Sequence, residues 1–336
     1  MYGLSLVTGV YSAALGILRY LSCPILLVVI GLYSGVLYAN VESPRQAEQH
    51  NILYHEGGWN NRLREYQFEA LEMLLEYSEE RYGPYVLNYK SRGLSSARMF
   101  EQVNSGDSVN LTLTPNSNPQ GDLDNLSYIR AGFFKGLLGL RTLIRRRSDE
   151  ERFEEIGDAA AFRKLSAGQG RGWAEVKIYE DANIRVVESL STDILFPMLV
   201  SKRSDYIPLS ILESESALSA LPDFRNALEI HRGMYVFYAL TSYLVANNKV
   251  PEMVERIQYG VNELYRHGAV NSLFTKHFPE YEDPFGRGAV KVFVLNNPEL
   301  SLADNKQAWQ NVYDIFFAHN PEAKIYYIDS SWNASE

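Results

Sequence analysis

Cysteine is almost absent from this chain of 336 residues, because its single thiol is Cys23 in an apolar stretch near the N-terminus. A mature chain without that stretch would contain no thiol, which suits an oxidising compartment without requiring a disulfide. Histidine is scarce as well, with six residues, no pair at i, i+4 spacing and no His-Glu-x-x-His motif. A structural zinc site needs such clustered ligands. We therefore expect neither a metal nor a cofactor.

Basic residues are also fewer than acidic residues. Lysine and arginine number 32 against 41 aspartates and glutamates, which gives a net charge of −9 and argues against a nucleic-acid partner. The one dense basic run is Arg145-Arg146-Arg147, and five acidic residues lie in the next eight positions. We expect this run to be a locally neutralised surface strand and turn.

Signatures of catalysis are missing from the sequence too. It contains no Gly-x-Ser-x-Gly elbow and no phosphate-binding loop. No pair of carboxylates can be singled out as a general acid and a general base. With 46% apolar and 22% charged residues, the composition is that of an ordinary globular protein with room for two lobes. We expect a protein that is not an enzyme.

The N-terminal region carries a long uncharged apolar run, residues 24–39, which follows Arg19 and ends at Ala39 before a polar stretch; residues 2–18 form another apolar stretch. This pattern is typical of a secretory signal peptide, so residues 1–39 predict export to the periplasm with cleavage near Ala39. Residues 21–39 are just long enough to cross a membrane with little tilt. An uncleaved N-terminal membrane anchor is therefore the alternative.

Residues 165–210 alternate between strand and helix patterns. An apolar run at 165–167 leads into a glycine-rich turn at 168–172, and a helix, a strand, a second helix and a third strand at 205–209 follow. This alternation predicts a parallel sheet, and ligands of such sheets bind at the carboxyl ends of the strands. Candidate ligand-binding residues in this half are Gln169, Arg171, Trp173, Asp205, Ser210 and Glu213.

Arg171 is the most informative of these candidates. Together with the N-terminus of the helix that follows, its guanidinium could hold an anion. The alternative is a solvated arginine on a surface turn. Trp173 has a similar pair of interpretations, either facing a ligand or packing at the start of a helix.

Residues 51–113 repeat this plan, with a strand, a turn, a helix over 64–82, a strand, a helix capped by Ser95 and a strand over 108–113. Glycine and proline at 83–84 should end the first helix. By the same argument as above, candidate ligand-binding residues in this half are Glu56, Trp59, Thr112 and Thr114. Trp59 should face Trp173 across a cleft.

Apolar runs at residues 138–144 and 235–240 flank the second unit, so we interpret them as two crossing strands that join the lobes. Helices over 251–268 and 271–278 would then return to the first lobe. The expected domains are residues 45–137 for the first part of lobe 1 and 138–234 for the crossing strand and lobe 2. Residues 235–280 form the return strand and the rest of lobe 1, and residues 281–336 form a C-terminal extension.

The stretches 164–173 and 203–208 resemble the extracellular solute-binding proteins of bacterial ABC transport, of the type II periplasmic binding class in its polar-amino-acid branch. The resemblance covers about residues 50–278, and the tail pattern 292–298 is similar to a divergent subgroup. It implies an α/β fold of two lobes, joined by two crossing strands, that close on a small polar solute. It also implies a monomer that works with a membrane permease.

The sequence departs from this family where the ligand is recognised. Amino-acid binders of the family usually carry a Thr-x-x-Arg-like segment after the strand near Thr114, yet Pro115 and Asn116 follow here. The threonine that usually follows the glycine turn of the second lobe is replaced by Arg171. These two departures from the family favour an anionic solute held by Arg171 over an ordinary amino acid. Uptake through a permease is the predicted function, and the alternative is a sensor or accessory protein that signals to a membrane partner.

Overall fold

The computed structural model describes residues 49–55, 61–90, 94–115, 123–281, 285 and 288–333. The predicted signal peptide or anchor, Glu56 and Trp59 lie outside the described residues. Among the helices that the model describes, none is both long enough and apolar enough to span a membrane.

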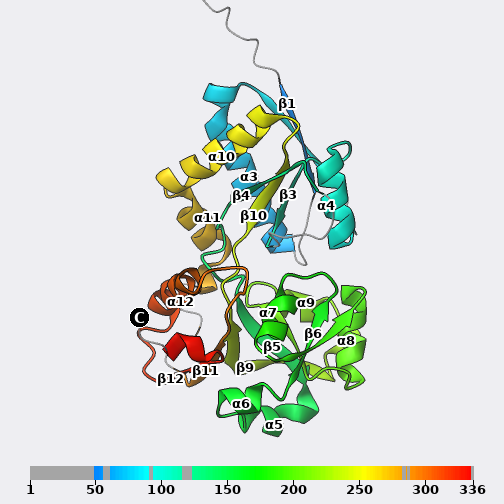
Figure 1. Cartoon of the computed structure of the whole chain (residues 1–336), viewed down its shortest axis with the longest axis vertical. Helices are drawn as coiled ribbons and strands as arrows, with labels where there is room; N and C mark the ends of the chain where they lie inside the picture. The colour runs from blue at the N-terminus through cyan, green and yellow to red at the C-terminus, as the bar shows by residue number, and fades with distance from the viewer. Residues whose placement is uncertain are drawn as a thin grey trace, which may run out of the picture. The chain divides into compact units, whose positions relative to one another are not determined.

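The first lobe is built on a five-stranded sheet in the order β2-β1-β3-β10-β4 (Figure 1). Its strands are β1 (His50–His55), β2 (Tyr85–Lys90), β3 (Leu111–Thr114), β4 (Leu126–Arg130) and β10 (Tyr243–Asn247). Its helices are α3 (Asn61–Tyr82), α4 (Ser96–Ser105), α10 (Pro251–Arg266) and α11 (Ala269–His277). Local signals set the helix ends: Gly83 follows α3 with φ 75°, and Ser95 caps α4 by accepting from Arg98 N.

The second lobe holds a seven-stranded sheet in the order β12-β11-β9-β5-β8-β6-β7 (Figure 1). Its strands are β5 (Leu140–Arg146), β6 (Ser166–Gly170), β7 (Arg185–Ser189), β8 (Tyr206–Ser210), β9 (Leu228–Phe237), β11 (Val290–Val294) and β12 (Ala323–Tyr327). Its helices are α5 (Glu150–Glu154), α6 (Ala159–Phe162), α7 (Glu175–Asp181), α8 (Thr192–Val200), α9 (Ser214–Ser219) and α12 (Leu302–Phe316).

The two sheets share one strand order. The run β2-β1-β3-β10-β4 in the first corresponds to β7-β6-β8-β5-β9 in the second. In each sheet the fourth strand is antiparallel, and the chain enters that strand directly after leaving the other lobe. This exchange of strands confirms the predicted two-lobed α/β fold class.

Two short segments connect the sheets, residues 131–139 between β4 and β5 and residues 238–242 between β9 and β10. The apolar runs predicted as crossing strands mostly lie within the second sheet, where β5 and β9 pair in antiparallel fashion. Because β4 runs parallel to β3 and β9 runs parallel to β8, both segments leave from the carboxyl edge of a sheet. Both also arrive at the carboxyl edge of the other sheet.

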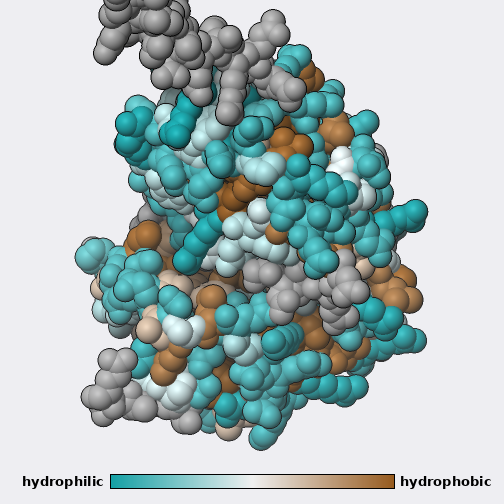
Figure 2. All heavy atoms as spheres, turned by 45° about the horizontal axis from the view of Figure 1, so that its top comes forward, coloured by the Kyte–Doolittle hydropathy of each residue, from teal (hydrophilic) through white to brown (hydrophobic). Residues whose placement is uncertain are grey.

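The C-terminal extension widens the second sheet. β11 pairs with β9 and β12 pairs with β11, both in parallel. Aromatic contacts attach the extension to the lobe: the ring centroids of Phe162 and Phe293 lie 4.2 Å apart, and those of Phe237 and Trp309 lie 5.0 Å apart. The view in Figure 2 shows a mainly hydrophilic surface with hydrophobic residues in smaller patches.

Two expectations about exposure are wrong. Arg145 and Arg146 are neutralised by carboxylates, as predicted, but they are only 2% and 6% exposed because β5 is a central strand covered on both faces. Only Arg147 of this run is exposed. In α8, the apolar residues Ile194, Leu195, Met198 and Leu199 predict a buried stripe. Ile194 is nevertheless 46% exposed, and the fully buried Phe196 packs in the core instead.

Candidate functional site

The carboxyl edges of the two sheets contain most of the predicted site residues that the structure describes. Thr112 and Thr114 belong to the last part of β3, Gln169 to that of β6, and Ser210 ends β8. Since β3 and β8 occupy corresponding places in the two sheets, Thr114 and Ser210 are equivalent positions. The topology therefore brings these residues to the two edges that the crossing segments join.

Thr112 and Thr114 are both buried in the first lobe. The Thr112 hydroxyl lies 3.4 Å from Nδ1 of His55, the last residue of the neighbouring strand β1. Thr114 pairs across the sheet with Tyr243, the first residue of β10. These threonines therefore mark the first lobe's carboxyl edge next to the second crossing segment.

Ser210 and Gln169 differ in how their polar atoms are used. The Ser210 hydroxyl donates to Leu137 O at 2.9 Å and accepts from Leu212 N at 3.2 Å, so it holds the first crossing segment against β8. Gln169 is fully buried, and neither atom of its amide group has a hydrogen-bond partner in the described part of the chain. A buried amide without partners carries a desolvation cost that a solute or a water molecule would offset.

Arg171 is exposed directly after β6, next to Gly172 with φ 75°. Its backbone N–H donates to Ser189 O at 2.8 Å, so only the side chain is available to a ligand. Trp173 packs in the core beside α8, and a Cβ atom at Gly170 would lie 2.3 Å from its ring. The packed interpretation of Trp173 thus accounts for its contacts.

The helix expected to help Arg171 is short and carries an acidic residue at its start. α7 has seven residues, and Glu175 in its first turn is buried. A helix this short contributes little dipole. The anion-binding interpretation of Arg171 therefore rests on its guanidinium alone.

Asp205 lies apart from the other candidates. It precedes β8 and accepts hydrogen bonds from Ser166, the first residue of β6, and from Arg152. These contacts place it at the amino edge of the sheet. Burial alone would raise the pKa of Asp205, but the bonds from Arg152 and Ser166 outweigh it and lower the pKa.

Sequence reasoning missed a buried ionic group around Arg141, which pairs with Ser210 across the carboxyl edge of β8. Arg141 Nη2 lies 2.7 Å from Glu175 Oε1, and its Nη1 lies 3.9 Å from Glu213 Oε2. Burial raises the pKa of the Glu213 carboxyl, which Arg141 only partly counteracts. One guanidinium thus faces two carboxylates beside the predicted site. The signal in the sequence was an arginine inside an otherwise apolar run.

Three fully buried tyrosines, Tyr179, Tyr206 and Tyr238, lie next to this group. Their ring centroids are 5.7 Å apart for Tyr179–Tyr238 and 6.4 Å apart for Tyr179–Tyr206. Tyr206 and Gln169 share one face of the sheet, because Ala167 pairs with Tyr206 and side chains alternate. Burial raises the pKa of all three phenols, which keeps them neutral. Three phenol hydroxyls and the Gln169 amide are therefore buried inside the second lobe.

No group of three or more possible metal ligands occurs within the residues described. Neither a protein-family model nor a curated protein sequence matches the chain.

Solved structures provide likenesses at low identity. An ancestral arginine-binding protein bound to arginine is 12% identical with a TM-score of 0.48, over 68% of this chain and 99% of that one. The GluR0 ligand-binding core in complex with L-glutamate is 10% identical with a TM-score of 0.49, over 69% and 98%. The VFT2 domain of BvgS from Bordetella pertussis is 11% identical with a TM-score of 0.44, over 68% and 92%. The fold class of this chain rests on its own strand order.

Proposed function

We propose that this protein is a non-enzymatic periplasmic receptor that binds a small polar solute between the carboxyl edges of its two sheets. The observation that carries the proposal is the course of the two crossing segments, which both join carboxyl edges. The second segment comprises only residues 238–242, so the ends of β9 and β10 lie within roughly 20 Å of each other. Ligands of α/β sheets bind at such edges, and closure of two lobes around a hinge is a known way to hold them.

The charged groups at the second lobe's edge indicate the chemistry of the solute. Arg171 presents an exposed guanidinium, which favours an anionic group such as a carboxylate. Glu213 is nearly buried and shares Arg141 with Glu175, so its carboxylate favours a hydrogen-bond donor or a cationic group. We therefore expect a solute that bears both an anion and a donor, delivered to a membrane permease for ABC-type uptake.

The solute can be identified by a thermal-shift screen of amino acids, organic acids, peptides and sugars. A ligand that binds only the folded protein raises its melting temperature by mass action. A hit that carries an anionic group supports the proposal. A strong hit from an uncharged sugar alone would contradict the role of Arg171.

Calorimetric titration of the hit then tests the two edge residues. Replacing Arg171 by alanine should weaken binding about ten- to a hundredfold, because a charged hydrogen bond contributes about 1.5 to 3 kcal/mol. Glu213→Gln should weaken a solute with a cationic group by a similar factor. The control is Arg203→Ala, which removes an exposed arginine before β8, at the opposite edge of the sheet. Wild-type affinity in the Arg171→Ala variant would show that Arg171 is a solvated surface residue that does not bind the solute.

Uptake measurements separate transport from the alternative of sensing. Cells lacking this protein should lose high-affinity uptake of the labelled solute if it serves a permease. Unchanged uptake combined with a lost cellular response to the solute would favour a sensor or accessory protein.

A further inference from the structure

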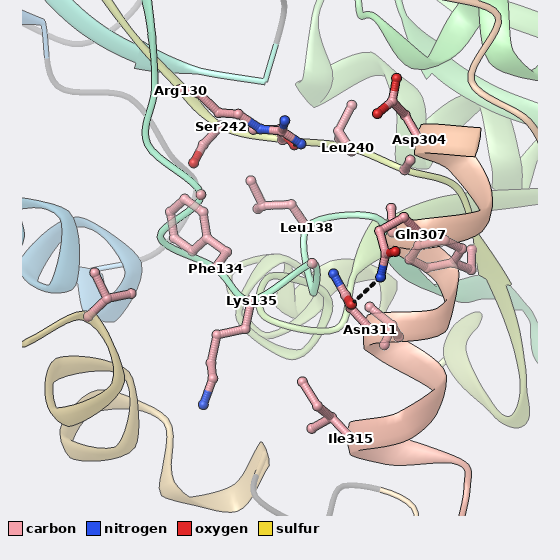
Figure 3. A pocket seen from close by; sticks show the side chains of 18 of the residues that line it. Arg130, Phe134, Lys135, Leu138, Leu240, Ser242, Asp304, Gln307, Asn311 and Ile315 are labelled. Carbon is pink, nitrogen blue, oxygen red and sulfur yellow. Dashed lines mark hydrogen bonds between the residues drawn. The ribbon is translucent and has the colours of Figure 1, made fainter. Parts of the chain in front are cut away.

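A pocket of about 610 Å³ lies where the two crossing segments meet α11 and α12 (Figure 3). This volume is within the range of small-molecule sites in proteins. None of the predicted site residues that the structure describes contributes to its walls. Its described lining therefore differs from the residues proposed to bind the solute, although it also lies beside the crossing segments.

The floor of the pocket is apolar. Phe134 and Leu138 come from the first crossing segment and Leu240 from the second, and all three are at most 8% exposed. Ile315 on α12 adds a wall that is 48% exposed, which is unusual for a large aliphatic side chain in the last turn of a packed helix. An apolar floor with an open aliphatic wall favours a ligand with an apolar body.

Two cations, Arg130 and Lys135, also line the pocket (Figure 3). Within the described residues neither forms an ion pair: Arg130 contacts only the Thr241 hydroxyl at 3.4 Å, and the Lys135 ammonium lies 5.2 Å from the Phe274 ring centroid. The two carboxylates of the lining are already engaged on α12 itself. Asp304 accepts from Ser301 at 2.6 Å and Asp314 accepts from Gln310 at 2.7 Å. The lining thus holds two cations and two carboxylates, and because no ion pair among the described residues engages Arg130 or Lys135, their N–H groups can donate to an anionic ligand.

The backbone holds Lys135 in a conformation that side chains rarely adopt. Lys135 has φ 52° and the next residue, Gly136, has φ 82°. A Cβ atom at Gly136 would lie 2.6 Å from Val312 of α12, so the turn is pressed against that helix. A non-glycine residue in this region is strained and tends to persist where function requires its position. Lys135 is thus presented at the pocket by a constrained turn.

Neutral hydrogen-bonding groups lie on the opposite wall. Gln307 Nε2 donates to Asn311 Oδ1 at 2.9 Å, and both carboxamides project from α12 toward the pocket (Figure 3). This pairing leaves the Gln307 carbonyl oxygen and the Asn311 amide hydrogens for a ligand.

We propose that this pocket is a second binding site, for a small carboxylate with an apolar body. The carboxylate binds the Lys135 ammonium, and the apolar body covers Leu138 and Ile315; Arg130 projects into another part of the pocket (Figure 3). One wall comes from α11 and the crossing segments, and the other from α12 of the C-terminal extension, whose Trp309 packs against Phe237 of β9. A ligand in this pocket contacts both sides of the hinge, and its affinity depends on the position of the lobes.

Calorimetric titration of the full chain with octanoate and 3-phenylpropanoate tests the proposal, with 1-octanol as the neutral counterpart of the same chain length. At least one carboxylate should bind saturably and at least tenfold more tightly than its alcohol. Lys135→Met should weaken carboxylate binding about tenfold and leave octanol binding unchanged, whereas Arg130→Met should have a smaller effect. Lys324→Met removes an exposed lysine from β12 and should have no effect.

A second variant outside the crossing segments tests the proposal in case substitution of Lys135 disturbs folding. Ile315→Glu alters a half-exposed side chain and places a negative charge beside the proposed carboxylate. It should weaken octanoate at least tenfold, with an unchanged melting temperature of the free protein. Equal binding of octanoate and octanol, unchanged octanoate affinity in Lys135→Met, or no saturable binding of either carboxylate would overturn the proposal.

Discussion

Two buried charges of the second lobe project from one face of β5. Arg141 and Arg145 lie four residues apart on β5, so both side chains project from the same side of the sheet. Each meets a carboxylate, Glu175 at 2.7 Å and Glu229 at 2.8 Å respectively. A buried guanidinium is tolerated only when it is paired, and removal of one partner leaves the other charge buried without compensation. Truncation of these glutamates should therefore affect folding more than binding.

His231 should make the protein sensitive to acid. It is 8% exposed on β9, and Arg145 Nε donates to its Nδ1 at 3.1 Å. Burial, followed by the charges of Arg145 and Lys291, lowers the pKa of His231 to about 4. The folded protein thus keeps this imidazole neutral, whereas the unfolded chain takes up a proton near pH 6.5. Stability should be fully present above pH 6.5 and fall by on the order of 3 kcal/mol toward pH 4.

Urea unfolding of His231→Gln at pH 7 and at pH 4.5 measures this contribution. Glutamine keeps a neutral acceptor but cannot be protonated, so the variant should lose less stability between these pH values than the wild type. His319→Gln, in an exposed turn, is the matched control. An equal acid response in wild type and His231→Gln would show that other groups dominate.

At the scale of elements, local signals were sufficient for the two long helices of the first lobe, whereas α12 (Leu302–Phe316) was not predicted. The predicted helix at 64–82 is α3 (Asn61–Tyr82), and the one at 251–268 is α10 (Pro251–Arg266). Their ends are encoded by nearby residues, such as Gly83 with its positive φ. Burial could not be read in the same way, because it depends on distant segments. Arg145 is covered only once β8 and β9 pair on either side of β5.

Gly260 permits the closest approach between the first lobe's two long helices. A Cβ atom there would lie 2.3 Å from the carbonyl oxygen of Leu74 in α3, and backbone cannot move aside cheaply. Gly260→Ala should therefore destabilise the protein by about 1 to 3 kcal/mol, although alanine is the better helix former. Asn262→Ala, at an exposed position of the same helix, is the control. Thermal unfolding compares the two, and a stabilised Gly260→Ala protein would contradict the close packing.

At the scale of the whole molecule, the sequence was sufficient for the two-lobed plan but not for all of the candidate site. The order of strands and helices placed Thr114, Gln169 and Ser210 at strand ends, and the structure brings them to the carboxyl edges. Asp205 was expected at the carboxyl edge by the same argument, but it precedes β8 and therefore lies at the amino edge. Arg141 was missed because β5 is antiparallel, so its start rather than its end reaches the carboxyl edge. Pairing direction is a long-range property that strand patterns do not encode.

The proposed function predicts that the two lobes move closer together when the solute binds. β2 and β7 are corresponding edge strands, and Lys90 and Glu188 are exposed near their carboxyl ends. Spin labels on Lys90→Cys and Glu188→Cys in a Cys23→Ser background would report the separation of the two edges, because Cys23 is the chain's only cysteine. Saturating solute should shorten this distance, as measured by pulsed electron resonance. A label pair at Lys90→Cys and Glu101→Cys lies within the first lobe and should not change. A solute shifts the protein to a closed state only if it binds that state more tightly than the open one. A solute that binds tightly but leaves the distance between the lobes unchanged would therefore contradict closure and favour a rigid binding site.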